Sequence, residues 1–88
     1  MRWVGRSDRE IGERVSEPNR MGIEGHDLRI SIREDFRGQW WLQCDSAGLN
    51  TVLDAKTAKQ ARHEAIQKVQ ERLERMLAEL HQIKAVTL

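Results

Sequence analysis

Acidic side chains that could act in general acid–base catalysis are present, but their spacing does not form a catalytic pattern. The candidates share a place in a predicted turn or at a predicted strand end, and they are Glu34, Asp35, Asp45 and Asp54. Aspartate is common at such positions because its carboxylate accepts hydrogen bonds from nearby backbone N–H groups. A catalytic pair needs two groups whose environments push their pKa values apart. We therefore expect no catalytic residues and no enzyme activity.

The histidines and the single cysteine do not form a metal-binding or nucleophilic pattern either. His63 and His81 lie on one predicted helix about five turns apart, so they cannot share a site. Cys44 has no second cysteine to pair with, and it alternates with the apolar Trp40 and Leu42, which is typical of a small buried side chain. We predict no metal and no cofactor, and a reducing, cytoplasmic location.

Arginine and tryptophan side chains on one face of a predicted sheet are the strongest candidates for binding. Arg29, Arg33, Trp41 and Gln43 alternate with apolar residues along two predicted strands, so they project from the face opposite the core. Tryptophan and arginine dominate the energetics of protein interfaces, and both can also stack on a base or bind a phosphate. The pattern predicts a partner-binding surface. The alternative is a solvated face that tolerates one exposed tryptophan.

Three predicted strands carry this surface. Leu28, Ile30 and Ile32 alternate with polar residues, as in a half-buried strand. Turns that end in Gly38 and Gly48 separate this strand from two more. The predicted strands cover residues 28–33, 39–44 and 49–53. The fold class is predicted to be α+β, with a three-stranded antiparallel sheet followed by one long C-terminal helix.

The long helix is predicted to begin at a capping pattern that runs from Thr57 to Gln60, because a threonine hydroxyl can accept a hydrogen bond from a free N–H of the first turn. From Ala58 to about Lys84 the sequence has neither glycine nor proline and is rich in helix-favouring residues. Such a helix is about 40 Å long, while a strand of five residues spans about 17 Å. The C-terminal half must therefore extend beyond the sheet.

This C-terminal half carries an apolar stripe. Its large side chains recur at spacings of three and four, as in a heptad repeat, and they are Leu73, Met76, Leu77, Leu80 and Ile83. Each forfeits about 1.5–3 kcal/mol when it stays in water instead of being fully buried. We predict that these residues pack between the helices of a homodimer. The alternative is that the N-terminal segment, with Trp3, Val4, Ile11 and Val15, folds back over them.

Residues 1–27 are predicted to form an N-terminal arm, and residues 28–88 to form the sheet and helix. The arm holds the only proline, several glycines and few apolar side chains. The capping pattern that starts at Ser7 favours a short helix from about Asp8 to Ser16. The alternative is an arm that becomes ordered only against a partner.

The composition of the chain further limits the class of protein that it can be. A chain of 88 residues has room for one domain with a small core. With 15 Lys and Arg against 14 Asp and Glu, the net charge is +1, whereas polyanion binders normally carry a clear basic excess. The sequence shows no signal-peptide pattern and no apolar window long enough to span a membrane. We expect a soluble protein with no membrane partner.

The middle of the chain resembles the N-terminal domain of HicB-type antitoxins and their small relatives. The matching segments are Gly38–Leu42, Asp45–Thr51, Asp54 and Thr57–Ala61. They follow the family's order of a glycine turn, an aromatic strand, an Asp-x-x-Gly turn, a short strand and a threonine-capped helix. The resemblance covers about residues 38–65 and implies a domain that occludes a small RNA-cleaving toxin without catalysis of its own. The layout is also similar to the arm-binding domains of phage integrases, which read DNA with the sheet.

These observations together predict a non-enzymatic protein-binding module. The prediction is a small inhibitor or antitoxin-like protein, of the anti-defence kind carried by mobile elements, that acts by occluding a protein partner. The alternative is a nucleic-acid-binding domain that combines Arg29, Arg33 and Trp41 of the open sheet face with basic residues of the early helix.

Overall fold

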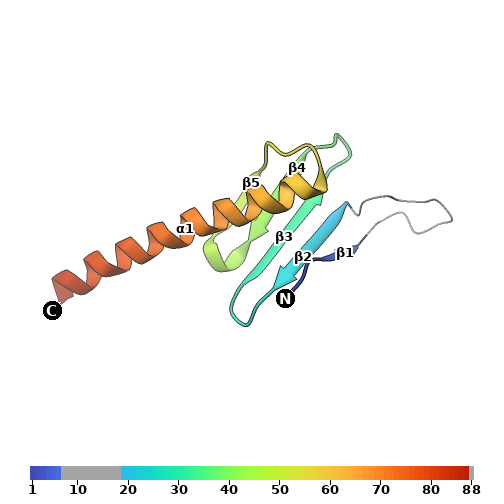
Figure 1. The fold of residues 1–88 in the computed structure, drawn as a ribbon. Coiled ribbons are helices and arrows are strands. Elements are labelled where there is room, and N and C mark those ends of the chain that lie inside the picture. The colour runs from blue at the N-terminus through green and yellow to red at the C-terminus, as the bar shows by residue number, and fades with distance from the viewer. Residues whose placement is uncertain (7–18, 88) are drawn as a thin grey trace.

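A computed structural model describes residues 1–6 and 19–87 of the chain. One antiparallel sheet has the strand order β1-β2-β3-β4-β5, and a single long helix, α1, crosses one of its faces (Figure 1). In chain order the elements are β1 (Val4–Arg6), β2 (Arg20–Glu24), β3 (Arg29–Glu34), β4 (Trp40–Cys44), the 3-10 helix η1 (Asp45–Ala47), β5 (Leu49–Val52) and α1 (Ala58–Thr87). The predicted α+β class and the long C-terminal helix are confirmed.

Within the described residues the sheet has five strands, so the prediction of three was wrong. The two additional strands, β1 and β2, lie within the segment 1–27 that the sequence predicted to be an arm. Their signal is weak because β2 has only Met21 and Ile23 as apolar residues, with Gly22 between them, and glycine weakens a strand interior. The short helix predicted from Asp8 to Ser16 lies outside the described residues.

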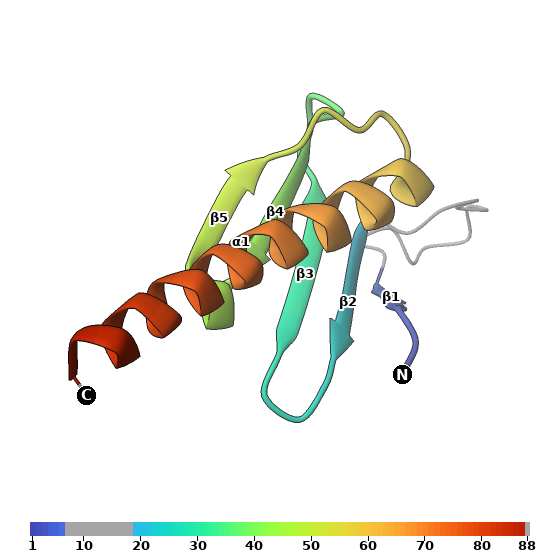
Figure 2. The ribbon, with the colours of Figure 1, turned by 60° about the vertical axis from the view of Figure 1, so that its left-hand side comes forward.

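The register of the strands divides their side chains between two faces. Across β3 and β4, Ile32 lies opposite Leu42, and Arg33 lies opposite Trp41. Ile32 and Leu42 are buried, whereas Arg33 is exposed and Trp41 half-buried on the other face. The predicted alternation is therefore confirmed: one face lies under α1, and the other face is open (Figure 2).

The core lies between the covered face of the sheet and the first half of α1. The sheet contributes large side chains such as Trp40, while the helix contributes small ones. The buried helix residues are Ala58, Ala61, Ala65 and Val69, at spacings of three and four. Small residues let the helix approach the sheet closely. Cys44 is a buried free cysteine of this core, as predicted.

The start of α1 is fixed by side-chain hydrogen bonds. Thr57 Oγ1 accepts a hydrogen bond from the Gln60 N–H (3.2 Å), and Gln60 Oε1 accepts one from the Lys56 N–H (2.9 Å). Glu64 accepts two more, from the backbone N–H groups of Asp54 (3.0 Å) and Ala55 (2.9 Å). The predicted cap is confirmed, and these bonds hold the β5–α1 loop against the helix.

The second half of α1 extends beyond the sheet, past η1 and β5 (Figures 1 and 2). No residue of α1 after Val69 is buried. The described residues of the N-terminal segment do not cover this half of the helix, in contrast to the alternative prediction. Trp3 packs against the core, and Val4 belongs to β1 at the opposite edge of the sheet. Ile11 and Val15 lie outside the described residues.

Candidate binding surface

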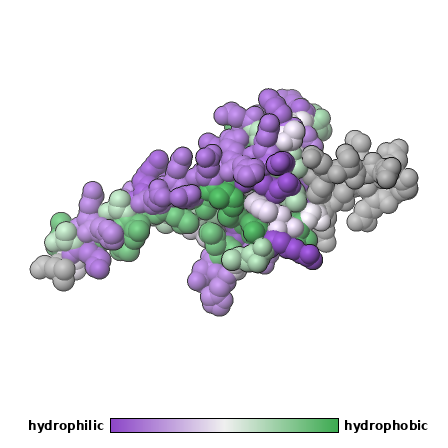
Figure 3. Space-filling model, in the orientation of Figure 1, coloured by the Kyte–Doolittle hydropathy of each residue, from purple (hydrophilic) through white to green (hydrophobic). Residues whose placement is uncertain are grey.

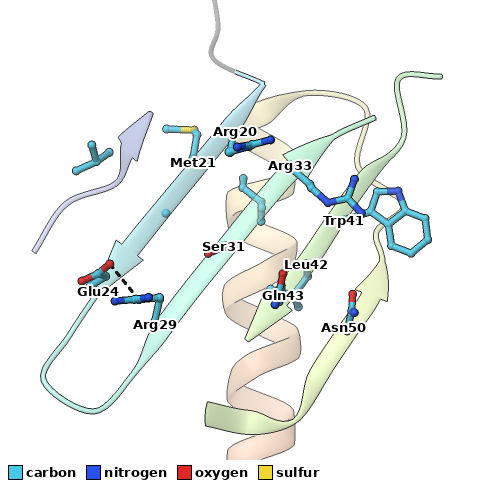
Figure 4. Close-up of a pocket in the computed structure, with 13 residues that line it drawn as sticks. Arg20, Met21, Glu24, Arg29, Ser31, Arg33, Trp41, Leu42, Gln43 and Asn50 are labelled. Carbon is cyan, nitrogen blue, oxygen red and sulfur yellow. Dashed lines mark ion pairs between the residues drawn. The ribbon is translucent and has the colours of Figure 1, made fainter. Parts of the chain in front are cut away.

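The open face of the sheet brings the four predicted binding residues together. Arg29, Arg33, Trp41 and Gln43 all line a shallow groove of about 480 Å³ that crosses the strands (Figure 4). Their place on one surface follows from the period-two alternation of β3 and β4. The binding role of these residues stays a prediction.

Strand β2 supplies groove residues that sequence reasoning missed. Arg20, Gly22 and Glu24 project from β2 onto the same face, and Asn50 of β5 closes the other side of the groove. Their alternation with Met21 and Ile23 was the available signal. It could be used only once this segment had been recognised as a strand.

Trp41 is held in place by two neighbours. The guanidinium carbon of Arg33 lies 5.5 Å from the centroid of the Trp41 ring, within the range of a cation–π contact. The indole N–H of Trp41 donates a hydrogen bond to Asp35 Oδ2 (3.1 Å). Figure 4 shows Arg33 and Trp41 side by side at one end of the groove. The pair is therefore ordered before any partner binds.

Asp35 organises the turn between β3 and β4. Its Oδ1 accepts hydrogen bonds from the backbone N–H groups of Arg37 (2.8 Å) and Gln39 (3.0 Å). Gly38, whose φ of 81° favours glycine, completes the turn by donating its N–H to the Asp35 carbonyl (3.1 Å). The Trp41 indole is the largest cause, and the Gln39 N–H the next, of a lowered pKa of the Asp35 carboxyl. The carboxylate form is the one that holds the turn together.

We expect acid to weaken the fold in part through Asp35. Because the folded-state pKa of Asp35 lies below its unfolded value, the carboxylate stabilises the fold above the unfolded pKa. This stabilisation is lost as the pH falls through the folded pKa. Between about pH 6 and about pH 2, the urea midpoint of the wild type should fall further than that of Asp35→Asn, which does not titrate. Equal falls, followed by tryptophan fluorescence, would contradict this role.

The groove has an excess of positive charge. Arg20 and Arg33 are cross-strand partners on the same face. Arg29 forms an ion pair with Glu24 (3.0 Å), but both side chains are largely exposed, so the pair contributes little. Three arginines against one glutamate line the groove. Such a surface attracts carboxylates or phosphates.

The predicted basic residues of early α1 lie on the helix that covers the other face of the sheet. Lys59 and Lys68 belong to α1, which covers the face of the sheet opposite to the groove (Figure 4). The nucleic-acid-binding alternative, which combines helix and sheet residues, stays a prediction.

The apolar stripe on the second half of α1 is a separate exposed surface. All five predicted helix-packing residues are exposed, from Leu73 at 37% to Ile83 at 58%. Val86, one turn further, is also exposed. Figure 3 shows hydrophobic atoms along one side of α1, continuing from the core onto this half, with hydrophilic atoms on the other side. Contiguous apolar surface of this kind is typical of an interaction site.

Comparison with known protein families, curated proteins and solved structures finds no match to this chain. The similarity to HicB-type antitoxins therefore stays a prediction that rests on residues 38–65. Within residues 1–6 and 19–87, no cluster of His, Cys, Asp and Glu is suited to hold a metal ion. No helix in the same ranges combines the length and the apolar character that a membrane span requires.

Proposed function

We propose that this chain is a non-enzymatic protein-binding module whose open sheet face binds an acidic segment of a partner protein. The observation that supports it is the ordered Arg33–Trp41 pair beside an uncovered groove. Arginine and tryptophan are the most frequent hot-spot residues of protein interfaces. Because Asp35 already fixes Trp41, little side-chain entropy is lost on binding.

The chemistry of the groove indicates what the partner must offer. Ser31 and Gln43 provide hydrogen-bond donors and acceptors along its middle, and Asn50 provides them at its β5 side. The arginines favour carboxylates, and the face of Trp41 favours an apolar or aromatic side chain. A partner segment with an apolar residue flanked by acidic residues meets both requirements.

Within this class we propose a small cytoplasmic inhibitor of the antitoxin type, encoded by a mobile element, that occludes its target. The resemblance of residues 38–65 to HicB-type antitoxins supports this role. The net charge of +1 also distinguishes the chain from strongly basic polyanion binders. Self-association through the exposed stripe of α1 forms part of the same proposal.

A nucleic-acid-binding function is the second candidate, and the arginines that line the groove beside Trp41 favour it. Arginine side chains are common ligands of backbone phosphates. Trp41 could then stack on a base. This function predicts an affinity that falls steeply with salt, because bound counterions are released.

Partner capture with the full chain tests both candidates. The wild type, expressed with a tag in its host, should retain a protein that mass spectrometry identifies and calorimetry with the purified partner confirms. Replacing both Arg33 and Trp41 by alanine should weaken this binding by at least about 30-fold, since each is expected to act as a hot spot. Undiminished binding by this variant would contradict the proposed surface. Recovery of nucleic acid without a protein would favour the second candidate.

Gly22→Val separates loss of binding from loss of folding. A Cβ at Gly22 would lie 3.5 Å from the Ile30 carbonyl oxygen and 3.8 Å from Ser31 Oγ, both ordinary contacts. Valine also favours strands more than glycine does. We expect the variant to keep or raise the urea midpoint while its side chain obstructs the groove and reduces binding. The matched control Phe36→Ala removes a 92% exposed aromatic side chain outside the groove and should bind normally.

A further inference from the structure

We infer that α1 pairs with α1 of a second copy of this chain in antiparallel orientation, so that the C-terminal half of each helix lies beside the edge of the partner's sheet. The inference rests on the self-association proposed above and adds its geometry. It is independent of what binds in the groove.

The exposed stripe lies on the same side of α1 as the residues that are buried against the sheet. The buried residues end at Val69, and the series continues at spacings of four and three through Leu73, Met76, Leu80 and Ile83. Residues at this spacing share one side of a helix, and Figure 3 shows the continuous hydrophobic side. The second half of α1 therefore overhangs an open step beside η1, where Arg72 Nε donates a hydrogen bond to the Ala47 carbonyl (3.1 Å).

A second helix has the right thickness for this step. The axes of packed helices lie about 8–10 Å apart. This spacing is similar to that of two sheets stacked face to face, which is about 10 Å. A helix packed on the exposed stripe would therefore lie in the same layer as the sheet, directly beyond its edge. The step would be filled without moving the sheet.

Only the antiparallel orientation avoids a collision. In a parallel pair, the first half of the partner's α1 would occupy the space that the sheet already fills, because the sheet and the stripe lie on the same side of α1. In an antiparallel pair, the partner's first half and its sheet lie beyond the C-terminal end of α1. The sheets then occupy opposite ends of the assembly.

The overhang matches a copy of itself in length. When Leu73 faces the partner's Ile83 and Met76 faces the partner's Leu80, the twofold axis passes between the two helices at the level of Ala78, and these four of the five stripe residues are paired. Thr87 then reaches the level of the partner's Val69, where the residues buried under the sheet end. The interface closes on itself, as twofold interfaces do.

The surface area that the helix pair would bury supports a dimer. The overhang from Leu73 to Thr87 is about 22 Å long, and two such helices carry twelve exposed large apolar side chains, since each chain contributes Leu73, Met76, Leu77, Leu80, Ile83 and Val86. Their pairing buries on the order of 1,000 Å², and contacts between each helix end and the partner's η1 bring this toward the range of stable interfaces.

Molecular mass tests the association. In sedimentation equilibrium at about 100 µM, the full-length wild type should be a dimer. Leu80→Glu, which places a charge within the stripe, should shift the chain to monomer by raising the dissociation constant at least about 100-fold. Ala78→Glu adds the same charge at an exposed position off the stripe and should stay dimeric. Tryptophan fluorescence reports whether the sheet stays folded. A monomeric wild type, or a dimeric Leu80→Glu, overturns the inference.

Disulfide formation tests the orientation separately. An equal mixture of Leu73→Cys and Ile83→Cys chains, one carrying a size tag, should form a disulfide between unlike chains. Each variant alone should stay uncrosslinked, because like residues are about 15 Å apart in the antiparallel pair and a disulfide needs Cα atoms within about 7 Å. Buried Cys44 makes the wild type the uncrosslinked control. Crosslinks within each variant alone would overturn the antiparallel arrangement. A dimer that fails to capture a partner would instead contradict only the function of the groove.

Discussion

Replacing Leu42 by alanine is expected to lower the free energy of unfolding by about 2–5 kcal/mol. Leu42 is completely buried and lies opposite Ile32 in the centre of the sheet, under α1. The alanine residues of the helix are too small to fill the cavity that truncation leaves. Because domains are stable by only about 5–15 kcal/mol in total, this loss is a large fraction of the stability, and the variant should unfold at a clearly lower urea concentration.

Urea unfolding followed by circular dichroism measures this loss. Phe36→Ala is the matched control, because it truncates a large side chain that is almost fully exposed, and such changes usually alter stability by less than about 0.5 kcal/mol. A Leu42→Ala loss as small as that of the control would contradict the central position of Leu42 in the core.

Replacing Ala65 by leucine is the second change with a large expected effect. Ala65 is completely buried between α1 and the sheet, where the close approach of the helix depends on a small side chain. A leucine there must displace the helix or neighbouring side chains, which costs about 1–3 kcal/mol. The urea midpoint should fall accordingly.

Ala78→Leu is the matched control, because Ala78 lies on the same helix but is exposed and does not pack against the sheet. Ala78→Leu changes helix propensity by the same small amount, so it should leave the urea midpoint nearly unchanged. If both leucine variants lose equal stability, the cause is helix propensity, and the packing of α1 against the sheet differs from that described above.

Elements with strong local signals could be predicted from the sequence, and elements that depend on distant pairing could not. The capping residues at Thr57 and the uninterrupted helix-favouring run after it predict α1. The alternation of apolar and polar residues around Ile32 and Leu42 predicts β3 and β4. Strand β2 has two apolar residues separated by glycine, and it is stabilised by pairing with β3 and β1 rather than by its own pattern. The sequence pattern therefore predicts three strands, whereas the described residues form five.

The candidate site could be predicted in part for the same reason. Arg33 and Trp41 were found because alternation alone places them on the open face. Arg20 and Gly22 were missed with the strand that carries them. The sequence predicts only the turn role of Asp35, because its hydrogen bond to the Trp41 indole depends on the register of two strands. The length of α1 relative to the sheet predicts that the apolar stripe extends beyond the sheet. Only the structure shows where the stripe lies relative to the edge of the sheet.

The position of α1 on one face of the sheet determines how many target molecules the inferred dimer can bind. In the inferred antiparallel dimer, the twofold axis turns one sheet over relative to the other, so the two grooves open in opposite directions. Such an assembly is a two-headed linker that joins separate target molecules and cannot clamp a single one between its halves. Against a target that is itself oligomeric, each first attachment would raise the local concentration for the next, and inhibition would be accompanied by crosslinking into larger particles.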